Sequence, residues 1–504
     1  MQKITPIILS NSIDIVRGGL TKAMFTRANT LARKFNKVVI LTFSFQQNHK
    51  EIIEEIYNKG LLNRNIEVHN MFVDLNSHKE RHKKSEVNKS ANEKGFIVFK
   101  DEKQKTNSSY RYYKNGFYVK YKRFDQQGNV LFIDYMNEGR HRTRREEYNK
   151  QGYLVRTRHM DITINKPSID RYFDNKGKCY ATIWIDPKTG KTGRVNVFDK
   201  TPKEFKSMES LKKSWVEKKI KKIKTPVIMT DKRDMDKLAL KLGHNNLKRV
   251  AVVHNNHFKK PFDNTAEIKK NYMTLFDNLN HFDKVVFLTE EQKEDVEHLF
   301  GNDNNNLTVI PHPAKHVTHD VRKEVEYNPY KAVTLARYVE QKRLDEAIEA
   351  FKFVVEKIPS AEYYIYGFGK KKDNLQQLIK RLRLQDNVKL KEFALDASAI
   401  YKSAACSILT SDYEGFGMVL TESLSAGTPV VTYNSKYGPS DIVRDEVDGF
   451  VVPKGNKEEL ANKIVKIMEN KDLRKKLSIK ALDVKTRFSL EDYTKRWNEL
   501  ISSI

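Results

Sequence analysis

Short apolar runs alternate with amphipathic stretches over two parts of the chain. In residues 1–72 and 206–317 the runs include KVVILTF, TPVIMTD, RVAVVH and KVVFLT, and the stretch KEIIEEIYNKGLL has the apolar spacing of a helix. Residues 318–485 repeat the alternation with KAVTLAR, LDEAIEAFKFVVEKI and TPVVTYN. Alternating strands and helices build parallel sheets that are covered by helices. The pattern therefore predicts an α/β protein with two similar α/β halves.

Residues 73–205 follow a different pattern, in which aromatic and charged residues alternate around glycine turns. Examples are YYKNGFYVKYKRF and FDNKGKCYATIWI. The glycines of these turns are Gly116, Gly128, Gly152, Gly177 and Gly190. Tight turns between alternating strands are typical of an antiparallel meander. We therefore expect a β-rich module inserted in the first α/β domain, with Lys and Arg exposed on one face of its strands.

Composition narrows the class of protein and of partner. The chain has 504 residues, 39% of them hydrophobic and 31% charged, which is typical of a soluble protein with several domains. Its 93 Lys and Arg residues exceed its 65 Asp and Glu residues by 28, an excess that favours a polyanionic partner. Nucleic acid, anionic lipid and a phosphate- or carboxylate-rich polymer all meet that description.

The cysteines and the N-terminus exclude other classes. Cys179 and Cys406 are the two cysteines, and they lie far apart without a cluster of metal-ligand spacing, so disulfide scaffolds and zinc sites are not expected. The N-terminal apolar run is too short for a signal peptide or a membrane-spanning helix. We expect a cytoplasmic protein, with peripheral contact at the inner membrane face as an open possibility.

The stretch SDYEGFGMVLTESLSAGTPVV carries the first candidate chemistry. Glu414 precedes the turn Gly415-Phe416-Gly417, and Glu422 follows Glu414 after seven intervening residues, inside the predicted helix. A strand, a glycine turn and a helix N-terminus offer free N–H groups and the positive end of a dipole to a phosphate or to sugar hydroxyls. The alternative is an ordinary strand-turn-helix unit with two solvent-facing acids.

Two further motifs could bind an anion. Arg337 and Lys342 follow the strand KAVTLAR, and two cations at the carboxyl end of a parallel strand can clamp a diphosphate. Gly18 and Gly19 precede a predicted helix, where glycine lets the backbone approach an anion closely. A solvated basic loop and a plain turn are the alternatives.

Three other polar residues have competing interpretations. His254 ends the strand RVAVVH, so its side chain could point into a ligand site or be an ordinary buried histidine. Asp234 and Asp236 have the spacing of an Asp-x-Asp metal motif. Because they fall in a charged, helix-like run, we expect both to lie on a solvated face.

Together and in this order, these motifs resemble retaining family-4 glycosyltransferases of the GT-B fold, in which two Rossmann-like domains face a cleft. The segment IYGFG at Ile365–Gly369 matches the same pattern. The opening GGLTKAMFTRAN, the inserted β-rich module and YNSKYGPSDIV are similar to the subgroup of wall teichoic acid α-glycosyltransferases, whose relatives glycosylate Ser-Asp-repeat surface proteins.

The resemblance implies an organisation of the chain into domains. Residues 1–72 and 206–317 would form the acceptor-side Rossmann-like domain, and residues 73–205 its inserted β-meander module. Residues 318–485 would form the UDP-sugar-binding domain. Residues 486–504 would be a C-terminal helix that crosses back to the N-terminal domain.

The resemblance also implies roles for single residues. Arg337 and Lys342 would neutralise the diphosphate of a UDP-sugar, Glu422 would hold the ribose and Glu414 the donor sugar, and His254 would lie beside the reacting centre. The implied catalytic residues are Glu414, His254, Arg337 and Lys342. The implied donor-binding residues are Gly18, Gly19, Arg337, Lys342, Phe416, Gly417, Met418, Val419 and Glu422. Neither a cofactor nor a metal is implied. Lys391-Glu392-Phe393 replaces the Arg-Gly of many relatives, which leaves the uracil contacts open, and no acceptor motif transfers.

The expected reaction is transfer of glucose or N-acetylglucosamine from UDP to a wall teichoic acid, a poly(polyol phosphate), with retention of configuration. Such a polymer carries one negative charge per repeat, and a basic β-rich module could hold several repeats at once. O-glycosylation of Ser-Asp-repeat adhesins is the alternative within the class. A nucleic-acid-binding protein with stacking strands, and an inactive sugar-nucleotide-binding subunit, are alternatives from other classes. Because exposed strand edges need a cover, we also expect a homo-oligomer formed through the module.

Overall fold

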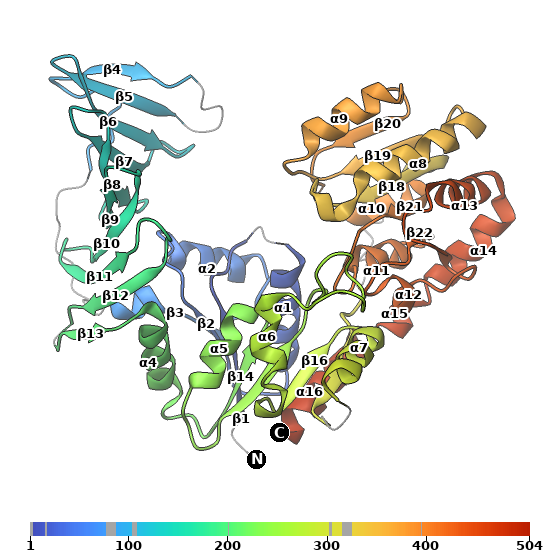
Figure 1. Cartoon of the computed structure of the whole chain (residues 1–504), viewed down its shortest axis with the longest axis horizontal. Coiled ribbons are helices and arrows are strands. Elements are labelled where there is room, and N and C mark those ends of the chain that lie inside the picture. The colour runs from blue at the N-terminus through green and yellow to red at the C-terminus, as the bar shows by residue number, and fades with distance from the viewer. Residues whose placement is uncertain are drawn as a thin grey trace. The chain divides into compact units, whose positions relative to one another are not determined.

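The computed structural model describes residues 4–15, 18–76, 87–102, 108–199, 201–301, 305–314, 325–394 and 396–504 (Figure 1). Contacts between Cα atoms divide the chain into two compact units. The first unit holds residues 1–17, 35–228 and 238–247, and the second holds residues 18–34, 229–237 and 248–504. Segments predicted to form one N-terminal domain thus contribute to both units, and the predicted domain boundaries stay predictions.

The first unit contains a parallel α/β part. Strand β2 pairs in parallel with both β1 and β3, with Ile8 opposite Ile40 and Ile40 opposite Val68. Trp215 packs edge-on against Phe43, with ring centroids 5.7 Å apart. The elements are β1 (Ile4–Ser10), β2 (Val38–Thr42), α2 (His49–Asn58), β3 (Ile66–Asn70), α3 (Met71–Leu75) and α4 (Met208–Ile220). Strand β14 (Thr225–Thr230) and helix α5 (Arg233–Lys241) each run from one unit into the other.

The rest of the first unit is an antiparallel sheet of ten strands in sequence order, and Figure 1 shows its successive hairpins. The predicted antiparallel β-rich insertion is therefore confirmed. The strands are β4 (Ile97–Lys100), β5 (Ser109–Lys114), β6 (Phe117–Phe124), β7 (Val130–Met136), β8 (Arg142–Tyr148), β9 (Leu154–Asp161), β10 (Lys166–Phe173), β11 (Cys179–Ile185), β12 (Thr192–Val197) and β13 (Lys203–Phe205).

Three hairpins of this sheet share one turn, which begins at Asp125, Asn149 or Asp174. In each turn the side chain accepts a hydrogen bond from the backbone N–H four residues on, at 2.8 to 2.9 Å, and the residue three positions on is a glycine with a positive φ. A register shift precedes every one of these turns. Asp and Asn bond their own backbone in turns, and glycine adopts the left-handed conformation without a Cβ penalty. The local sequence therefore sets the register of these strands.

Several Lys and Arg side chains of the sheet are paired with carboxylates, which differs from the predicted exposed basic face. Arg145 donates two hydrogen bonds to Asp134, at 2.7 and 2.8 Å, and Arg158 donates two to Asp170, both at 2.8 Å. Lys122 is buried and bonds Glu93 at 2.9 Å. The prediction was wrong for these residues because carboxylates neutralise them, across the strands for the two arginines and from the segment before β4 for Lys122.

The second unit contains a small parallel group of strands and a six-stranded parallel sheet. Strand β16 pairs with β15 and with β17. The six-stranded sheet has the order β20-β19-β18-β21-β22-β23. Its strands are β18 (Asn328–Leu335), β19 (Glu362–Tyr366), β20 (Val388–Lys391), β21 (Ala404–Leu409), β22 (Val430–Tyr433) and β23 (Gly449–Val452). The smaller group is β15 (Lys248–Val252), β16 (Lys284–Phe287) and β17 (Leu307–Val309).

Helices cover the six-stranded sheet because their apolar stripes face its strands. Phe351 stacks on Tyr363 with centroids 5.1 Å apart, in a core that also includes Ile348, Ile365 and Leu460. The helices of the second unit are α1 (Gly19–Leu31), α6 (Lys270–Phe276), η1 (Leu279–His281), α7 (Glu290–Phe300), η2 (Glu340–Lys342), α8 (Leu344–Lys357), α9 (Lys372–Arg381), α10 (Ala397–Lys402), α11 (Met418–Ser425), α12 (Pro439–Ile442), α13 (Lys457–Glu469), α14 (Lys471–Ala481), α15 (Val484–Arg487) and α16 (Leu490–Ser503). No helix within the described ranges is long and apolar enough to cross a membrane.

The C-terminal helix α16 packs on α1. The guanidinium of Arg27 lies over the ring of Trp497, 5.1 Å from its centroid, and both side chains are buried. Lys34 donates a hydrogen bond to the carbonyl of Asn498 at 3.4 Å. The end of the chain therefore holds the helix that begins at the Gly18-Gly19 motif.

We expect Asp170→Ala to destabilise the ten-stranded sheet by about 3 kcal/mol, because it leaves Arg158 without its buried carboxylate and removes the second carboxylate of Arg156, which keeps Glu147. The shift in the midpoint of urea unfolding measures this effect. Glu204→Ala, which removes an exposed ion pair with Arg194 in the same sheet, is the matched control and should cost about 0.5 kcal/mol or less. Equal shifts in the two variants would contradict the assignment.

Candidate functional site

The strand order of the six-stranded sheet reverses between β18 and β21. The chain continues from β18 through β19 to β20 on one side, and from β21 through β22 to β23 on the other. Ligands of open α/β sheets bind at the carboxyl ends of the strands, at the point where the order reverses. Arg337 and Lys342 follow β18, and Glu414 follows β21. The topology thus brings both predicted motifs to the switch point.

Lys342 and Glu414 form an ion pair, with the ammonium bonded to Oε1 of the carboxylate. Their side chains are 13% and 11% exposed, so the pair is shielded but still reaches solvent. The two loops are also tied through the backbone, since the Gln341 side chain donates to the carbonyl of Tyr413 at 2.9 Å and the Asp412 N–H donates to the carbonyl of Gln341 at 2.8 Å. The structure therefore joins two motifs that lie 72 residues apart.

Arg337 lies exposed at the end of β18. Burial raises the pKa of Tyr413, and the positive charge of Arg337 partly offsets this rise, which places the guanidinium near that ring. Among the described residues no carboxylate forms an ion pair with Arg337. The guanidinium is therefore available to an anionic ligand at the switch point.

The Gly415-Phe416-Gly417 turn is fixed by close backbone contacts. A Cβ at Gly415 would overlap the carbonyl oxygen of His254, and a Cβ at Gly438 would overlap that of Phe416. Gly417 has a φ of +84° and caps the N-terminus of α11. The first N–H groups of a helix have no partner within it, so those of Met418 and Val419 are available to a ligand.

The Gly18-Gly19 motif lies beside this helix start. Helix α1 begins at Gly19, and a Cβ added there would lie 2.5 Å from Cε of Met418. Nothing lies within 4 Å of the corresponding position at Gly18. The neighbour at position 19 is the mobile end of the Met418 side chain, whereas position 18 is open. The structure brings this predicted motif together with the turn that was predicted to bind the donor.

His254 belongs to a buried group with Asp231 and Arg27. Its Nε2 lies 2.6 Å from Oδ1 of Asp231, and the other carboxylate oxygen accepts a hydrogen bond from Arg27 at 2.5 Å. Burial lowers the pKa of His254 and outweighs the opposing effect of the Asp231 charge. Burial alone would raise the pKa of Asp231, but the charge of Arg27 and the bond to His254 bring it below its usual range.

Sequence reasoning missed His312, which completes this group. Its ring stacks on that of His254 with centroids 5.5 Å apart and meets Phe416 edge-on, also at 5.5 Å. Burial is the main cause that lowers the pKa of His312 to about 3, and the neighbouring His254 and Arg27 lower it further. The sequence did contain a signal for both residues, namely a polar residue just after an apolar strand. Asp231 follows β14 and His312 follows β17, as His254 follows β15.

The prediction of a solvated Asp-x-Asp face was wrong for Asp236. Asp234 is exposed, but Asp236 is fully buried and accepts a hydrogen bond from Thr230 at 2.6 Å. Arg233 lies 3.3 Å from its other oxygen. Burial raises the pKa of Asp236 to about 6. In the described part of the chain, no group of three or more His, Cys, Asp and Glu side chains is arranged to hold a metal ion.

Glu422 lies on α11 and is partly exposed. Burial is the main cause that raises the pKa of Tyr401 on α10, and the negative charge of Glu422 raises it further. Glu414 stands on the loop and Glu422 on the helix that follows, as predicted from their spacing.

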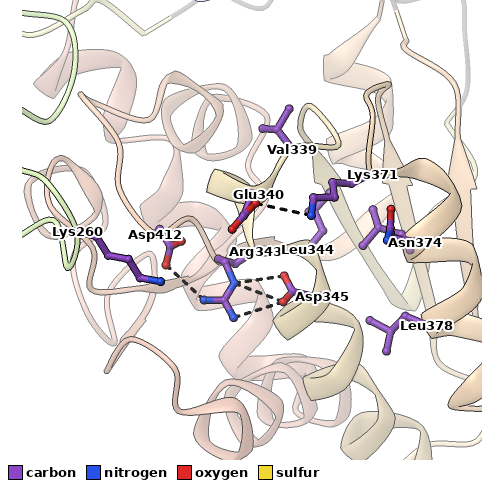
Figure 2. Close-up of a pocket in the computed structure, with 11 residues that line it drawn as sticks. Lys260, Val339, Glu340, Arg343, Leu344, Asp345, Lys371, Asn374, Leu378 and Asp412 are labelled. Atoms are coloured by element: carbon purple, nitrogen blue, oxygen red, sulfur yellow. Dashed lines mark hydrogen bonds and ion pairs between the residues drawn. The ribbon is translucent and has the colours of Figure 1, made fainter.

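A cavity of about 370 Å³ is lined by Glu340 and Arg343 of the turn after β18 (Figure 2). Its charged lining is balanced, because Arg343 bonds Asp345 and Asp412, and Lys371 lies 3.7 Å from Glu340. Leu344, Leu375 and Leu378 supply an apolar wall. The cavity includes neither Glu414 nor His254, so it is distinct from the predicted donor contacts.

Two family models match the chain. The model described as "Glycosyl transferases group 1" matches residues 318–483, and that described as "Glycosyl transferase 1 domain A" matches residues 7–188. A poly(glycerol-phosphate) alpha-glucosyltransferase of Bacillus subtilis is 28% identical over 97% of this chain and 73% of its own length. A poly(ribitol-phosphate) alpha-N-acetylglucosaminyltransferase of Staphylococcus aureus is 28% identical over the full length of both chains.

Solved structures resemble the whole chain as well. A mutant of S. aureus TarM, in complex with fondaparinux, alpha-GlcNAc-glycerol and UDP, has a TM-score of 0.84 and 25% identity, with 99% of each chain covered. The pneumococcal O-GlcNAc transferase GtfA, in complex with UDP and GlcNAc, has a TM-score of 0.78 and 16% identity, with the same coverage. The second likeness concerns the fold alone.

We expect Gly415→Ala to lower the melting temperature and to displace Glu414, because the added methyl group would overlap the carbonyl oxygen of His254. Overpacking of this kind costs about 1 to 3 kcal/mol. Gly18→Ala, at a position with no neighbour within 4 Å, is the matched control and should melt as the wild type does. Wild-type melting of Gly415→Ala would show that the turn is not fixed by this contact.

Proposed function

We propose that this chain, which is a glycosyltransferase of the GT-B fold, transfers glucose or N-acetylglucosamine from a UDP-sugar to a poly(polyol phosphate) with retention of configuration. The observation that carries the proposal is the joining of Lys342 to Glu414 at the switch point, beside Arg337 and the start of α11. Two cations, a helix N-terminus and a carboxylate provide what a diphosphate and the hydroxyls of a sugar require.

The leaving group is stabilised by charge. Arg337, Lys342 and the N–H groups at the start of α11 would face the negative charge that develops on the departing UDP. Because Lys342 already shares its charge with Glu414, a bound diphosphate would compete with that carboxylate and free it to accept hydrogen bonds from the sugar. These residues supply positive charge from the protein itself, so we propose that the reaction needs no metal.

His254 would orient the sugar as a neutral hydrogen-bond acceptor. The carboxylate of Asp231 can only accept, so the hydrogen bond assigns the imidazole proton to Nε2 and leaves the lone pair on Nδ1. The lowered pKa of His254 keeps the ring neutral at pH 7. A hydroxyl of the sugar can donate to Nδ1, which links Asp231 to the geometry of the reacting centre.

The named relatives support the choice of acceptor. The two relatives that span the chain carry poly(glycerol-phosphate) and poly(ribitol-phosphate) in their names. Protein O-glycosylation is the second candidate, because a peptide N-acetylglucosaminyltransferase subunit of Streptococcus gordonii is 28% identical over 41% of this chain. The polymer comes first because its relatives keep 28% identity along 97% and 100% of this chain, whereas the peptide transferase subunit keeps it over 41%.

We also propose that the chain self-associates through the β-rich module. The terminal strand β4 exposes Ile97 and Phe99, at 63% and 54%, and an apolar strand edge favours pairing with another chain. A cytoplasmic location, with or without contact with a membrane surface, stays a prediction.

The reaction is tested by incubating the protein with UDP-glucose and UDP-N-acetylglucosamine in EDTA. The parallel acceptors are poly(glycerol phosphate), poly(ribitol phosphate) and a Ser-Asp-repeat peptide. We expect mass spectrometry to detect one hexose or one N-acetylhexosamine per modified polymer repeat. Modification of the peptide alone would overturn the polymer assignment, and a requirement for added divalent metal would overturn the metal-free mechanism.

We expect Lys342→Met and Glu414→Gln each to lower kcat/KM at least 100-fold, because each removes one half of the ion pair and one donor contact. Initial rates of transfer measure this loss. The control is Lys457→Met, which breaks an ion pair with Glu349 on the helices of the same sheet and should retain the wild-type rate. Comparable activity in all three variants would refute the site assignment.

A further inference from the structure

Lys269 lies near the proposed donor site and carries a charge that no described residue neutralises. Its ammonium donates to the carbonyl of Asn256 at 2.8 Å and lies 4.4 Å from the ring centroid of Tyr413. Its side chain is half-buried, and no ion pair with a described carboxylate is present. Burial lowers the pKa of this ammonium to about 8, which reflects the missing counter-charge.

Two aromatic rings form the floor beneath this ammonium. Phe262 and Tyr413 pack with ring centroids 4.3 Å apart, and Lys269 is 5.4 Å from the centroid of Phe262. A cation over aromatic faces is held in position without being neutralised. Lys269 is therefore oriented but retains its capacity to bind an anion.

The arrangement is continuous with the donor site through Tyr413. This residue immediately precedes Glu414, and its carbonyl accepts the hydrogen bond from Gln341, the neighbour of Lys342. A group bound at Lys269 would therefore lie next to the loop that holds the donor sugar.

The charges around the two rings favour an anion. Lys454 lies 5.6 Å from the centroid of Phe262 and 3.3 Å from Asp412. The nearby carboxylates already have partners, since Asp412 is shared between Lys454 and Arg343, Glu414 is bonded to Lys342, and Asp263 accepts hydrogen bonds from Thr265. Lys269 and Arg337, both without an ion-pair partner among the described residues, add positive charge near Tyr413.

We propose that Lys269 binds the phosphodiester of the acceptor repeat whose hydroxyl is modified. This inference rests on the proposed function. In the proposed function Arg337 and Lys342 bind the two phosphates of the donor. Lys269, a third cation next to the Glu414 loop, is therefore available to bind a separate anion. A poly(polyol phosphate) supplies that anion within the same repeat as every acceptor hydroxyl, whereas an uncharged polyol does not. Lys269 would thus select phosphate-bearing acceptors.

The test compares Lys269→Met with the wild type on two acceptors, poly(glycerol phosphate) and free glycerol. Methionine keeps an apolar stem against Tyr413 while removing the charge. We expect kcat/KM for the polymer to fall at least tenfold, as for the loss of a hydrogen bond to a charged group. The rate with glycerol and the KM for the UDP-sugar should stay within about twofold. Lys269→Arg should recover part of the polymer activity.

The matched control is Lys331→Met, since Lys331 also lies over a tyrosine ring, that of Tyr364 at 4.6 Å, and its pKa is also lowered by burial. This variant should behave as the wild type with both acceptors. An unchanged kcat/KM of Lys269→Met on the polymer, or equal losses on polymer and glycerol, would overturn the inference alone. If the wild type modifies neither teichoic acid polymer, the proposed function fails and the inference falls with it.

Discussion

The ion pair between Lys342 and Glu414 connects the two halves of the six-stranded sheet at the point where its order reverses. Each residue follows a strand that begins its own half, so the pair exists only when β18 and β21 lie side by side. A lysine that is bonded to one carboxylate can still change its partner, because a diphosphate carries more negative charge than one carboxylate. In the proposed reaction this contact would hold Lys342 in place until a diphosphate takes over its charge. The backbone of His254 packs against Gly415, and this contact fixes the position of the Gly-Phe-Gly turn next to Glu414.

Much of the fold and part of the site could be predicted from the sequence. The apolar runs of the six-stranded sheet, the glycine turns and the helix that starts at Met418 all follow from local periodicity and turn chemistry. The positions of Arg337, Lys342 and Glu414 follow from the rule that ligands meet the carboxyl ends of strands. These features depend on short stretches of chain, so one sequence suffices to locate them.

The remainder depends on partners distant in the chain. Asp231 and Arg27 are 204 residues apart, and nothing local in either segment indicates that they share a buried hydrogen bond. Asp236 was misjudged because a charged neighbourhood suggests solvent, whereas its helix phase and Thr230 place it in the interior. The arginines of the ten-stranded sheet were misjudged in the same way, because pairing across strands decides whether a charge is displayed or neutralised.

The recurrent turn of the ten-stranded sheet has a consequence for how such a module changes in length. Each of the turns at Asp125, Asn149 and Asp174 contains its own capping side chain and left-handed glycine, and none borrows these from a neighbour. Each hairpin and its turn therefore form a unit, here called a cassette, that fixes its own strand register. Duplication or deletion of a whole cassette preserves the alternation of side chains in the strands that remain, whereas an insertion of one residue within a strand reverses it. The number of strands in the module can therefore change in steps of two without a change in the register of the others.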